Sequence, residues 1–261
     1  MGYGDDLMFV GECRKEPNKI FTPISKGQLT WSPMFYNLPY LAKNGGVEKS
    51  VRPANGGKWR WYVKSSSETH IGFTDWRCSP GEIRFTKIEM EEAKYRTRDI
   101  DRPFVFINPA VKNSYTQNKD WGQDKWVYLA KILNYFQIPM VESPPLTSDV
   151  YPARAKIPGV KQIGTKHIRK AFAIMSLAKT FVSTEGAIHH GAAALGLPGI
   201  VIFGGFISPQ TTGYDMHVNM YPDDPRSPCG NKQLCNHCQE MMEKIDPRTV
   251  AGKIKQIIGS K

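Results

Sequence analysis

The chain has 261 residues, of which 40% are hydrophobic and 23% are charged. This composition excludes a largely disordered chain, and the length suffices for one large domain or two small ones. No stretch approaches the roughly eighteen continuous apolar residues of a membrane-spanning helix. Carboxylates at Asp5 and Asp6 stand where a secretory signal needs positive charge. We therefore expect a cytoplasmic protein, in the host cytoplasm if the chain is viral.

The net charge of +11 indicates the kind of partner. Both halves of the chain are basic, and residues 150–184 contain seven lysines and arginines but no carboxylate. Such an asymmetry suits a polyanion such as a phosphorylated glycan, a nucleotide or a nucleic acid. A solvated basic face without a partner is the alternative.

Residues 1–100 predict a loop-rich α/β lobe. Short strand-like runs at 19–24, 59–63 and 83–86 stand between turn signals. A charged helical run at 88–98 then leads to residues 99–103, which we take as the linker between two domains.

Residues 101–261 predict a doubly wound parallel sheet. Apolar runs at 104–108, 138–143, 180–184 and 199–203 alternate with helical patterns at 124–136, 168–179 and 189–196. Strands that alternate with helices favour parallel pairing with right-handed crossovers. Ligands of such sheets bind at the carboxyl ends of the strands, so the loops after Asn108, Ser183 and Phe203 are the places to look.

The segment 181–205 is the most informative. Its strand is followed by a carboxylate and a Gly/Ala-rich helix start, which can lie close to a sheet and offer amides to a phosphate. Close packing around an interior histidine is the alternative. The segment resembles the donor-site signature of glycosyltransferase family 9, which includes the ADP-heptose:lipopolysaccharide heptosyltransferases. By this resemblance Glu185 stands for the family's donor-sugar aspartate and His190 for its histidine, while Gly186 and Ala187 replace a Thr-Gly pair.

The resemblance implies a GT-B fold of two Rossmann-like lobes, here with a shortened N-terminal lobe. Residues 1–100 would bind the acceptor, and residues 101–261 would bind a nucleotide-sugar. The run Gly4-Asp5-Asp6-Leu7-Met8 resembles the family's loop that carries the proposed general base, so Asp5 takes that role at a loop tip and Asp6 is the nearby alternative. The family has a complete strand before this loop, whereas only three residues precede Gly4. An ordinary turn is the competing interpretation.

The resemblance also implies the donor site. Residues 107–126 resemble the family's strand, polar loop and helix start, which makes Lys119 the lysine that balances phosphate charge, with Lys112 second. The loop after Phe203 can cradle a diphosphate with amides and hydroxyls. The implied donor-binding residues are Lys119, Lys112, Thr184, Glu185, Gly186, Ala187, His190, Gly204, Gly205, Thr211 and Thr212.

These residues predict an inverting glycosyltransferase that needs no metal or other cofactor beyond its nucleotide-sugar. The sequence slightly favours viral DNA with a hydroxylated base as acceptor, because the lobe that should choose the acceptor departs most from the family and no lipid-facing apolar stretch is evident. Lys58, Trp59, Arg60 and Trp61 interleave cations with aromatic rings, which suits contact with the DNA backbone and base stacking. A half-buried strand is the plainer explanation of that run. A heptosyltransferase-like enzyme of surface-glycan synthesis is the alternative function, and a non-catalytic nucleotide-binding module is the alternative of another class.

The five cysteines are an odd number without a secretory context, so we expect thiols rather than a disulfide framework. Three of them lie with a histidine within ten residues: Cys229, Cys235, His237 and Cys238. These four could hold a structural zinc ion, but adjacent His237 and Cys238 rarely reach one tetrahedral ion together. Reduced, partly buried thiols are the default, and a basic Cys-rich zinc protein is a third functional class.

Overall fold

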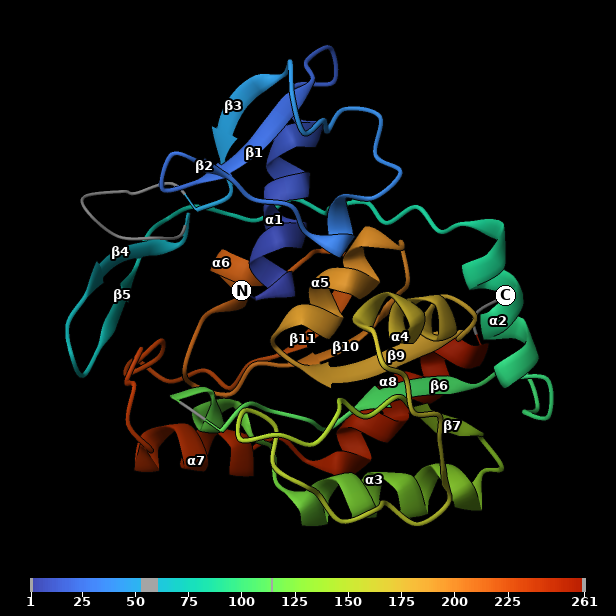
Figure 1. The fold of residues 1–261 in the computed structure, drawn as a ribbon. Coiled ribbons are helices and arrows are strands. Elements are labelled where there is room, and N and C mark those ends of the chain that lie inside the picture. Colours follow the sequence, from blue (N-terminus) through green and yellow to red (C-terminus); the bar gives the residue numbers. More distant parts are fainter. Residues whose placement is uncertain (1, 53–60, 114, 260–261) are drawn as a thin grey trace.

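The computed structural model describes residues 2–52, 61–113 and 115–259 (Figure 1). Its centre is a six-stranded sheet in the order β11-β10-β9-β6-β7-β8, in which every neighbouring pair is parallel. The strands are β6 (Val105–Asn108), β7 (Met140–Glu142), β8 (Val160–Gln162), β9 (Thr180–Thr184), β10 (Gly199–Ile202) and β11 (His217–Met220). Counted along the chain, this is the order 3-2-1-4-5-6 of a doubly wound dinucleotide-binding sheet. The predicted α/β class with a doubly wound parallel sheet is confirmed.

The central strands form because their side chains are buried on both faces. β9 and β10 are buried throughout, as expected for a parallel sheet covered by helices. In β6, Val105 and Ile107 point to one face, and Phe104 and Phe106 supply the other.

Two layers of helices cover the sheet (Figure 1). The helices α3 (Gln123–Tyr135) and α8 (Pro247–Gly259) pack on the face of Val105, whereas α4 (Ile168–Met175) and α5 (Ala187–Ala194) pack on the face of Phe106. The predicted helices at 124–136, 168–179 and 189–196 are therefore confirmed within a few residues. Among the described residues, no helix is long and apolar enough to cross a membrane.

The N-terminal lobe is small. Its helix α1 (Tyr3–Arg14) lies beneath a three-stranded sheet in the order β2-β1-β3. The sheet consists of β1 (Phe21–Ser25), β2 (Gln28–Leu29) and β3 (Val47–Ser50), and a short 3₁₀ helix, η1 (Pro33–Phe35), follows β2. A separate hairpin joins β4 (Val63–Ser66) to β5 (Ile71–Phe73). The lobe is therefore built from one long helix and short strands.

Three local predictions in this lobe need comment. The strand at 19–24 is confirmed as β1, and the run at 59–63 reaches the described residues only at its end, where β4 begins at Val63. The strand predicted at 83–86 is wrong. That stretch belongs to no helix or strand, and residues just before it are packed on α1, where Arg14 donates to the carbonyls of Pro80 and Gly81.

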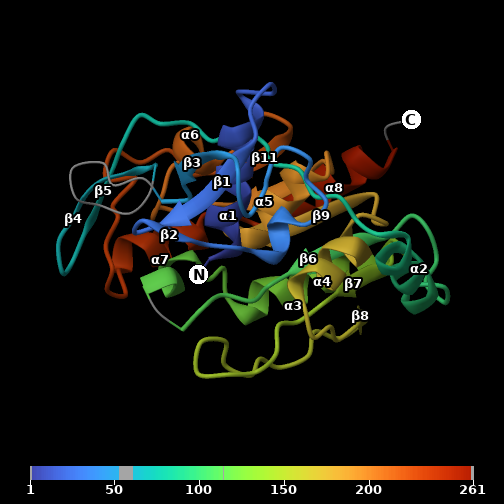
Figure 2. The same cartoon turned by 45° about the horizontal axis from the view of Figure 1, so that its top comes forward.

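The prediction that Asp5 and Asp6 lie at a loop tip is also wrong. Both residues lie in the first turn of α1 and are buried. Carboxylates in a first turn are stabilised by the helix dipole. Leu7, Phe9 and Val10 follow directly, and their burial holds the helix against its neighbours. Figures 1 and 2 both show α1 against α5, between the small sheet and the large one.

The two lobes share one hydrophobic core. Leu7 and Phe9 of α1 belong to the same buried cluster as Phe106 and Phe181 of the large sheet. A second connection runs through α2 (Lys87–Arg96), the helix predicted at 88–98, which packs on α4. The helix begins at a capping box, in which Thr86 and Glu89 bond each other's backbone amides.

Arg169 of α4 joins the lobes electrostatically. Its guanidinium donates to both carboxylate oxygens of Glu89, at 2.7 and 2.9 Å, and to the carbonyls of Pro33 and Arg84. Arg169 belongs to the basic stretch 150–184, yet it is buried, because its guanidinium donates these four hydrogen bonds inside the protein.

Candidate functional site

The site lies where the strand order reverses. The chain runs outward from β6 through β7 to β8, then returns to β9 on the other side of β6, so the crossovers diverge at the carboxyl ends of β6 and β9. Such a divergence opens the crevice in which doubly wound sheets bind their ligands. β6 ends at Asn108 and β9 at Thr184, which matches two of the three loops singled out from the sequence.

Lys119 and Glu185 meet at this point. Lys119 ends the 3₁₀ helix η2 (Tyr115–Lys119) in the loop after β6, and Glu185 follows β9 directly. Their ammonium and carboxylate form an ion pair in which only 12% and 5% of the two side chains are exposed. Burial is the largest influence and acts to raise the pKa of Glu185, but the neighbouring groups together, the Lys119 ammonium first among them, outweigh it, so that the pKa lies below its usual value. The pair is therefore a buried charge-neutral unit with an acid held ionised.

The start of α5 is organised by His189. The Gly186 amide donates to Nδ1 of His189 at 2.9 Å, and Nε2 of the same ring lies 2.8 Å from the Thr212 carbonyl oxygen. Because Nδ1 accepts, Nε2 carries the proton and donates. Burial lowers the pKa of His189, which keeps the ring neutral. The amide of Gly186 is thus already engaged within the protein.

His190 connects Glu185 to Tyr214. Its Nδ1 lies 2.7 Å from the Tyr214 hydroxyl, and its Nε2 lies 3.8 Å from Oε1 of Glu185. Burial holds the pKa of His190 well below its ordinary value, so the ring is neutral. The thiol of Cys78 lies in the same region and donates to the carbonyl of Gly213 at 3.3 Å. His190 is therefore a neutral ring that hydrogen-bonds to Tyr214 and lies beside the carboxylate of Glu185.

The first turn of α1 touches the start of α5. A Cβ on Gly4 would come within 2.9 Å of Cδ2 of His190 and 3.5 Å of Cα of Ala187, so only glycine allows this approach. Asp5 follows at once. Its carboxylate lies 3.4 Å from the Tyr62 hydroxyl and 3.5 Å from the guanidinium of Arg52. The structure therefore brings the acid-bearing turn into contact with the strand-to-helix junction at residue 185.

Asp6 has a different environment from Asp5. Its Oδ2 accepts a hydrogen bond of 2.6 Å from Ser32, and its Oδ1 is buried without a partner among the described residues. Burial raises the pKa of Asp6 to about 6, although the Ser32 hydrogen bond opposes the shift. Asp6 is held inside the N-terminal lobe.

Gly204 and Gly205 pack against the C-terminal part of the chain. A Cβ on Gly204 would meet Met242 at 2.6 Å, and one on Gly205 would meet His237 at 2.8 Å. The pair thus permits close approach of α7 (Asn236–Glu243). Thr211 and Thr212 are buried in the short helix α6 (Pro209–Thr212), with the Thr211 carbonyl accepting from the amide of Cys78.

Lys112 lies apart from the Lys119–Glu185 pair. It lines a cavity of about 690 Å³ at the start of α3, together with Asp120, Gln123 and Arg154. The lining includes neither Glu185 nor Asp5. The cavity flanks the loop that carries Lys119.

Of the proposed acceptor residues, Lys58, Trp59 and Arg60 lie outside the described residues. Trp61 is stacked on Trp76, with ring centroids 6.2 Å apart and planes 20° apart, so one face of its ring is already covered. The basic stretch 150–184 is also partly used internally, because Arg154 donates to the Pro109 carbonyl at 2.8 Å.

Several site residues could not be identified from the sequence. They are Ser32, Arg52, Tyr62, Cys78, Asn118, His189 and Tyr214. Asn118 lies inside the recognised stretch 107–126, Tyr214 lies in the loop after Phe203, and His189 is next to the residue that the resemblance selected. The other four lie outside the recognised motifs. No local pattern marks them, because the tertiary fold brings them together.

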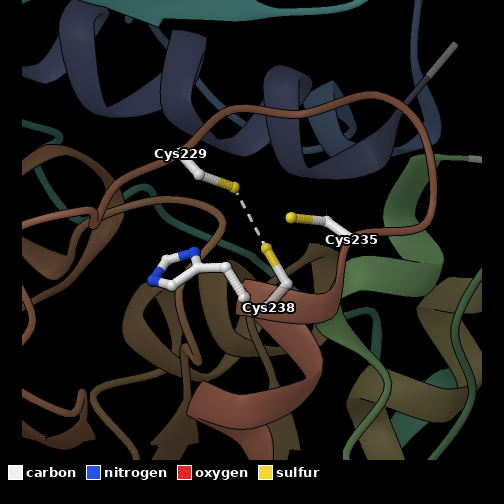
Figure 3. Close-up of side chains that lie close together, drawn as sticks. Cys229, Cys235 and Cys238 are labelled. Atoms are coloured by element: carbon white, nitrogen blue, oxygen red, sulfur yellow. Dashed lines mark hydrogen bonds between the residues drawn. The ribbon is translucent and has the colours of Figure 1, made fainter.

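Within the part of the chain that the structure describes, two side-chain groups have the spacing of metal sites. The donor atoms of Glu185, His189 and His190 lie within 4.8 Å of one another, but the Lys119 ammonium already neutralises Glu185 and both nitrogens of His189 are engaged. The second group is Cys229, Cys235, His237 and Cys238 (Figure 3).

A doubly wound parallel sheet joined to a smaller lobe defines a GT-B-like α/β protein. The sequence profile of glycosyltransferase family 9 (heptosyltransferase) matches residues 75–245. The chain belongs to this family. No curated protein matches the chain along its sequence.

Solved structures support the same fold. The bacterial iron-containing dodecameric glycosyltransferase TibC from enterotoxigenic E. coli superposes with a TM-score of 0.62 at 15% identity, over 98% of this chain and 74% of TibC. E. coli ADP-heptose lps heptosyltransferase II superposes with a TM-score of 0.51 at 15% identity, over 68% of this chain and 53% of its own. A TibC complex with ADP-D-beta-D-heptose gives 0.51 at 17% identity, over 69% and 49%. The chain thus spans about half the length of the heptosyltransferase II it matches.

Proposed function

We propose that the chain is an inverting glycosyltransferase that moves a sugar from a nucleotide-sugar to an acceptor hydroxyl. The observation that carries the proposal is the contact between two elements far apart in sequence: the acid-bearing first turn of α1 and the junction at Glu185. Family membership and the nucleotide-binding strand order support it. ADP-heptose is the first donor to test, because a matched TibC structure is described in complex with it.

The C-terminal lobe, residues 101–261, would bind the donor at the switch point. In the structure Lys119 pairs with Glu185. We propose that the Lys119 ammonium also contacts the diphosphate of the donor and that the Glu185 carboxylate accepts hydrogen bonds from hydroxyls of the sugar. Thr184, Gly186, Ala187 and His190 would form the wall of the site beside the sugar. The Gly204 loop, with Thr211 and Thr212, would support this wall from α6 and α7.

The N-terminal lobe, residues 1–100, would present the acceptor. The Asp5 carboxylate would accept the proton of the acceptor hydroxyl while that oxygen forms its bond to the anomeric carbon. The bond between that carbon and the diphosphate oxygen breaks in the same step, and Lys119 stabilises the charge that develops on the leaving group. Asp5 suits this role better than Asp6, which is bonded to Ser32 inside the lobe. Arg52 and Tyr62 would orient the base.

We favour a surface-glycan hydroxyl as the acceptor. Family membership favours it, and the DNA acceptor suggested by the aromatic-basic run loses support because Trp61 is stacked on Trp76 and Arg169 is buried against Glu89. If DNA is the acceptor, the affinity of the protein for DNA should fall steeply as salt is added.

The experiment measures thermal stabilisation by a panel of nucleotide-sugars, followed by mass spectrometry of candidate acceptors with the best donor. A donor present at 100 times its Kd should stabilise the fold by about 2.7 kcal/mol. Asp5→Asn should keep this stabilisation and lose turnover by roughly 10² to 10⁴. Asp99→Asn, at a residue whose side chain is 75% exposed, is the control and should keep both.

Two outcomes oppose the proposal. If no nucleotide-sugar raises the Tm, the donor site is misplaced. If a donor binds but the wild-type chain transfers nothing to any glycan or DNA acceptor, the chain is a nucleotide-binding module.

A further inference from the structure

Three thiols and an imidazole converge beside the start of α7 (Figure 3). The donor atoms of Cys229, Cys235, His237 and Cys238 all lie within 4.8 Å of one another. The sulfurs of Cys229 and Cys238 are 3.1 Å apart, and neither residue is in a disulfide. Cys235 caps α7 and Cys238 lies three residues later, so both side chains project from one face of the first turn. The expected obstacle, adjacent His237 and Cys238, does not prevent convergence.

The imidazole of His237 has one nitrogen free for a ligand. Its Nδ1 is buried and has no hydrogen-bond partner among the described residues. Its Nε2 lies 3.2 Å from the Ser227 hydroxyl and 3.6 Å from the Asp224 carboxylate. Metal-ligating histidines commonly hold the second nitrogen in this way, on a hydroxyl or a carboxylate.

The backbone around Cys229 also suits a thiolate. The Asn231 amide points at Sγ of Cys229 from 3.5 Å. Gly230, with φ of +62°, turns the chain directly after the cysteine, and a Cβ there would come within 2.0 Å of the Ile71 carbonyl oxygen. The turn and the amide together hold the sulfur toward the helix.

We propose that Cys229, Cys235, Cys238 and Nδ1 of His237 bind one metal ion of the zinc or iron class in a tetrahedral site. Sulfur-rich tetrahedral sets select these ions over calcium or magnesium, which require oxygen ligands. All four positions are filled by protein, which is the arrangement of a structural rather than a catalytic ion.

The ion would brace the switch-point loop. Asn118 donates to the carbonyls of Asn231 and Gln233, at 2.7 Å each, and accepts from the amide of Cys235 at 2.9 Å. Lys119 directly follows Asn118 in the chain. The loop of residues 229–238 therefore fixes the segment that carries Lys119. Loss of the ion should therefore loosen residues 115–119 as well as the loop itself.

The test is metal analysis of the full chain, purified under reducing conditions without chelator and then dialysed against Zn²⁺ or Fe²⁺ separately. Retention of about one ion per chain is expected, and the two additions identify which metal is held more tightly. Substitution by Co²⁺ should give the visible bands of a tetrahedral thiolate complex. The readout needs no transferase activity, so it stands apart from the proposed function.

Variants make the assignment specific. Cys229→Ser and His237→Ala should each reduce retained metal at least tenfold, and Asp224→Asn should weaken binding roughly 10- to 100-fold through the orientation of His237. Cys13→Ala, at a buried thiol of α1, should retain the ion. Because a cysteine variant can misfold, hydrogen exchange of the wild-type chain with and without metal is the second measurement, with slower exchange expected at 115–119 and 229–238. A wild-type chain that retains no ion in either metal, or that contains a Cys229–Cys238 disulfide under reducing conditions, overturns the proposal.

Discussion

Lys119 and Glu185 are 66 residues apart in the chain, yet they form an ion pair across the point where the strand order of the large sheet reverses. Removal of the ammonium should therefore be costly. Lys119→Met leaves a buried carboxylate without its partner and should reduce the free energy of unfolding by about 3 to 5 kcal/mol. Lys119→Met combined with Glu185→Gln should recover most of the loss, as measured by urea denaturation of the three variants. An additive double variant would show that the two side chains are not coupled.

Gly4 permits the contact between the two lobes. The methyl group of Gly4→Ala would lie 2.9 Å from the ring of His190 and 3.5 Å from the Ala187 backbone. We expect a loss of about 1 to 3 kcal/mol through overpacking. Gly252→Ala is the matched control, because a Cβ at that helical position meets nothing within 4 Å. It should stabilise the protein by about 0.5 to 1 kcal/mol. Equal effects of the two variants on the Tm would show that α1 does not pack on α5 as described.

Asp6 should make stability depend on pH. Burial raises its pKa from 3.8 to about 6, so the folded state holds a proton that the unfolded chain releases. Between these values this group's contribution to stability falls as pH rises, by about 3 kcal/mol in total. Asp6→Asn removes the titration, so the stability difference between variant and wild type should shift in favour of the variant from pH 4 to pH 7. A difference that is constant over this range would mean that Asp6 is ionised in the folded protein.

Arg169 should contribute far more to stability than its neighbour Lys170. Arg169→Met leaves Glu89 unpaired and removes the donors to two backbone carbonyls, so we expect a loss of about 3 to 5 kcal/mol. Lys170 pairs with Glu92 through a side chain that is 36% exposed. Lys170→Met should change stability by less than about 1 kcal/mol. The measurement compares the denaturant midpoints of the two variants. Similar losses of stability in both would contradict the role given to Arg169 in joining the two lobes.

The C-terminal lobe was predictable because its central strands are buried on both faces. The apolar runs at 104–108 and 199–203 have few alternatives to a parallel sheet. Edge strands lack this signal, and β8 and β11 were missed because Lys161 and Asn219 interrupt them with polar side chains.

Helix α1 was missed for the opposite reason. Residues from Asp5 to Cys13 are all buried, so polar and apolar side chains surround the helix without an amphipathic stripe. The roles suggested for Lys119 and Glu185 came from family resemblance. Their contact depends on the strand order, and the places of Arg52 and Tyr214 depend on tertiary packing that no local pattern encodes.

The packing of α1 on α5 also has a consequence during synthesis. Leu7, Phe9 and Val10 belong to a helix that packs on α5, which ends at Ala194. A ribosome must therefore make most of the polypeptide before these residues find their native neighbours. Contacts of such long sequence separation form slowly. Until they form, the apolar side chains of residues 7–13 stay exposed and prone to aggregation. Chaperones that bind short apolar peptides would be expected to recognise residues 7–13 on nascent chains.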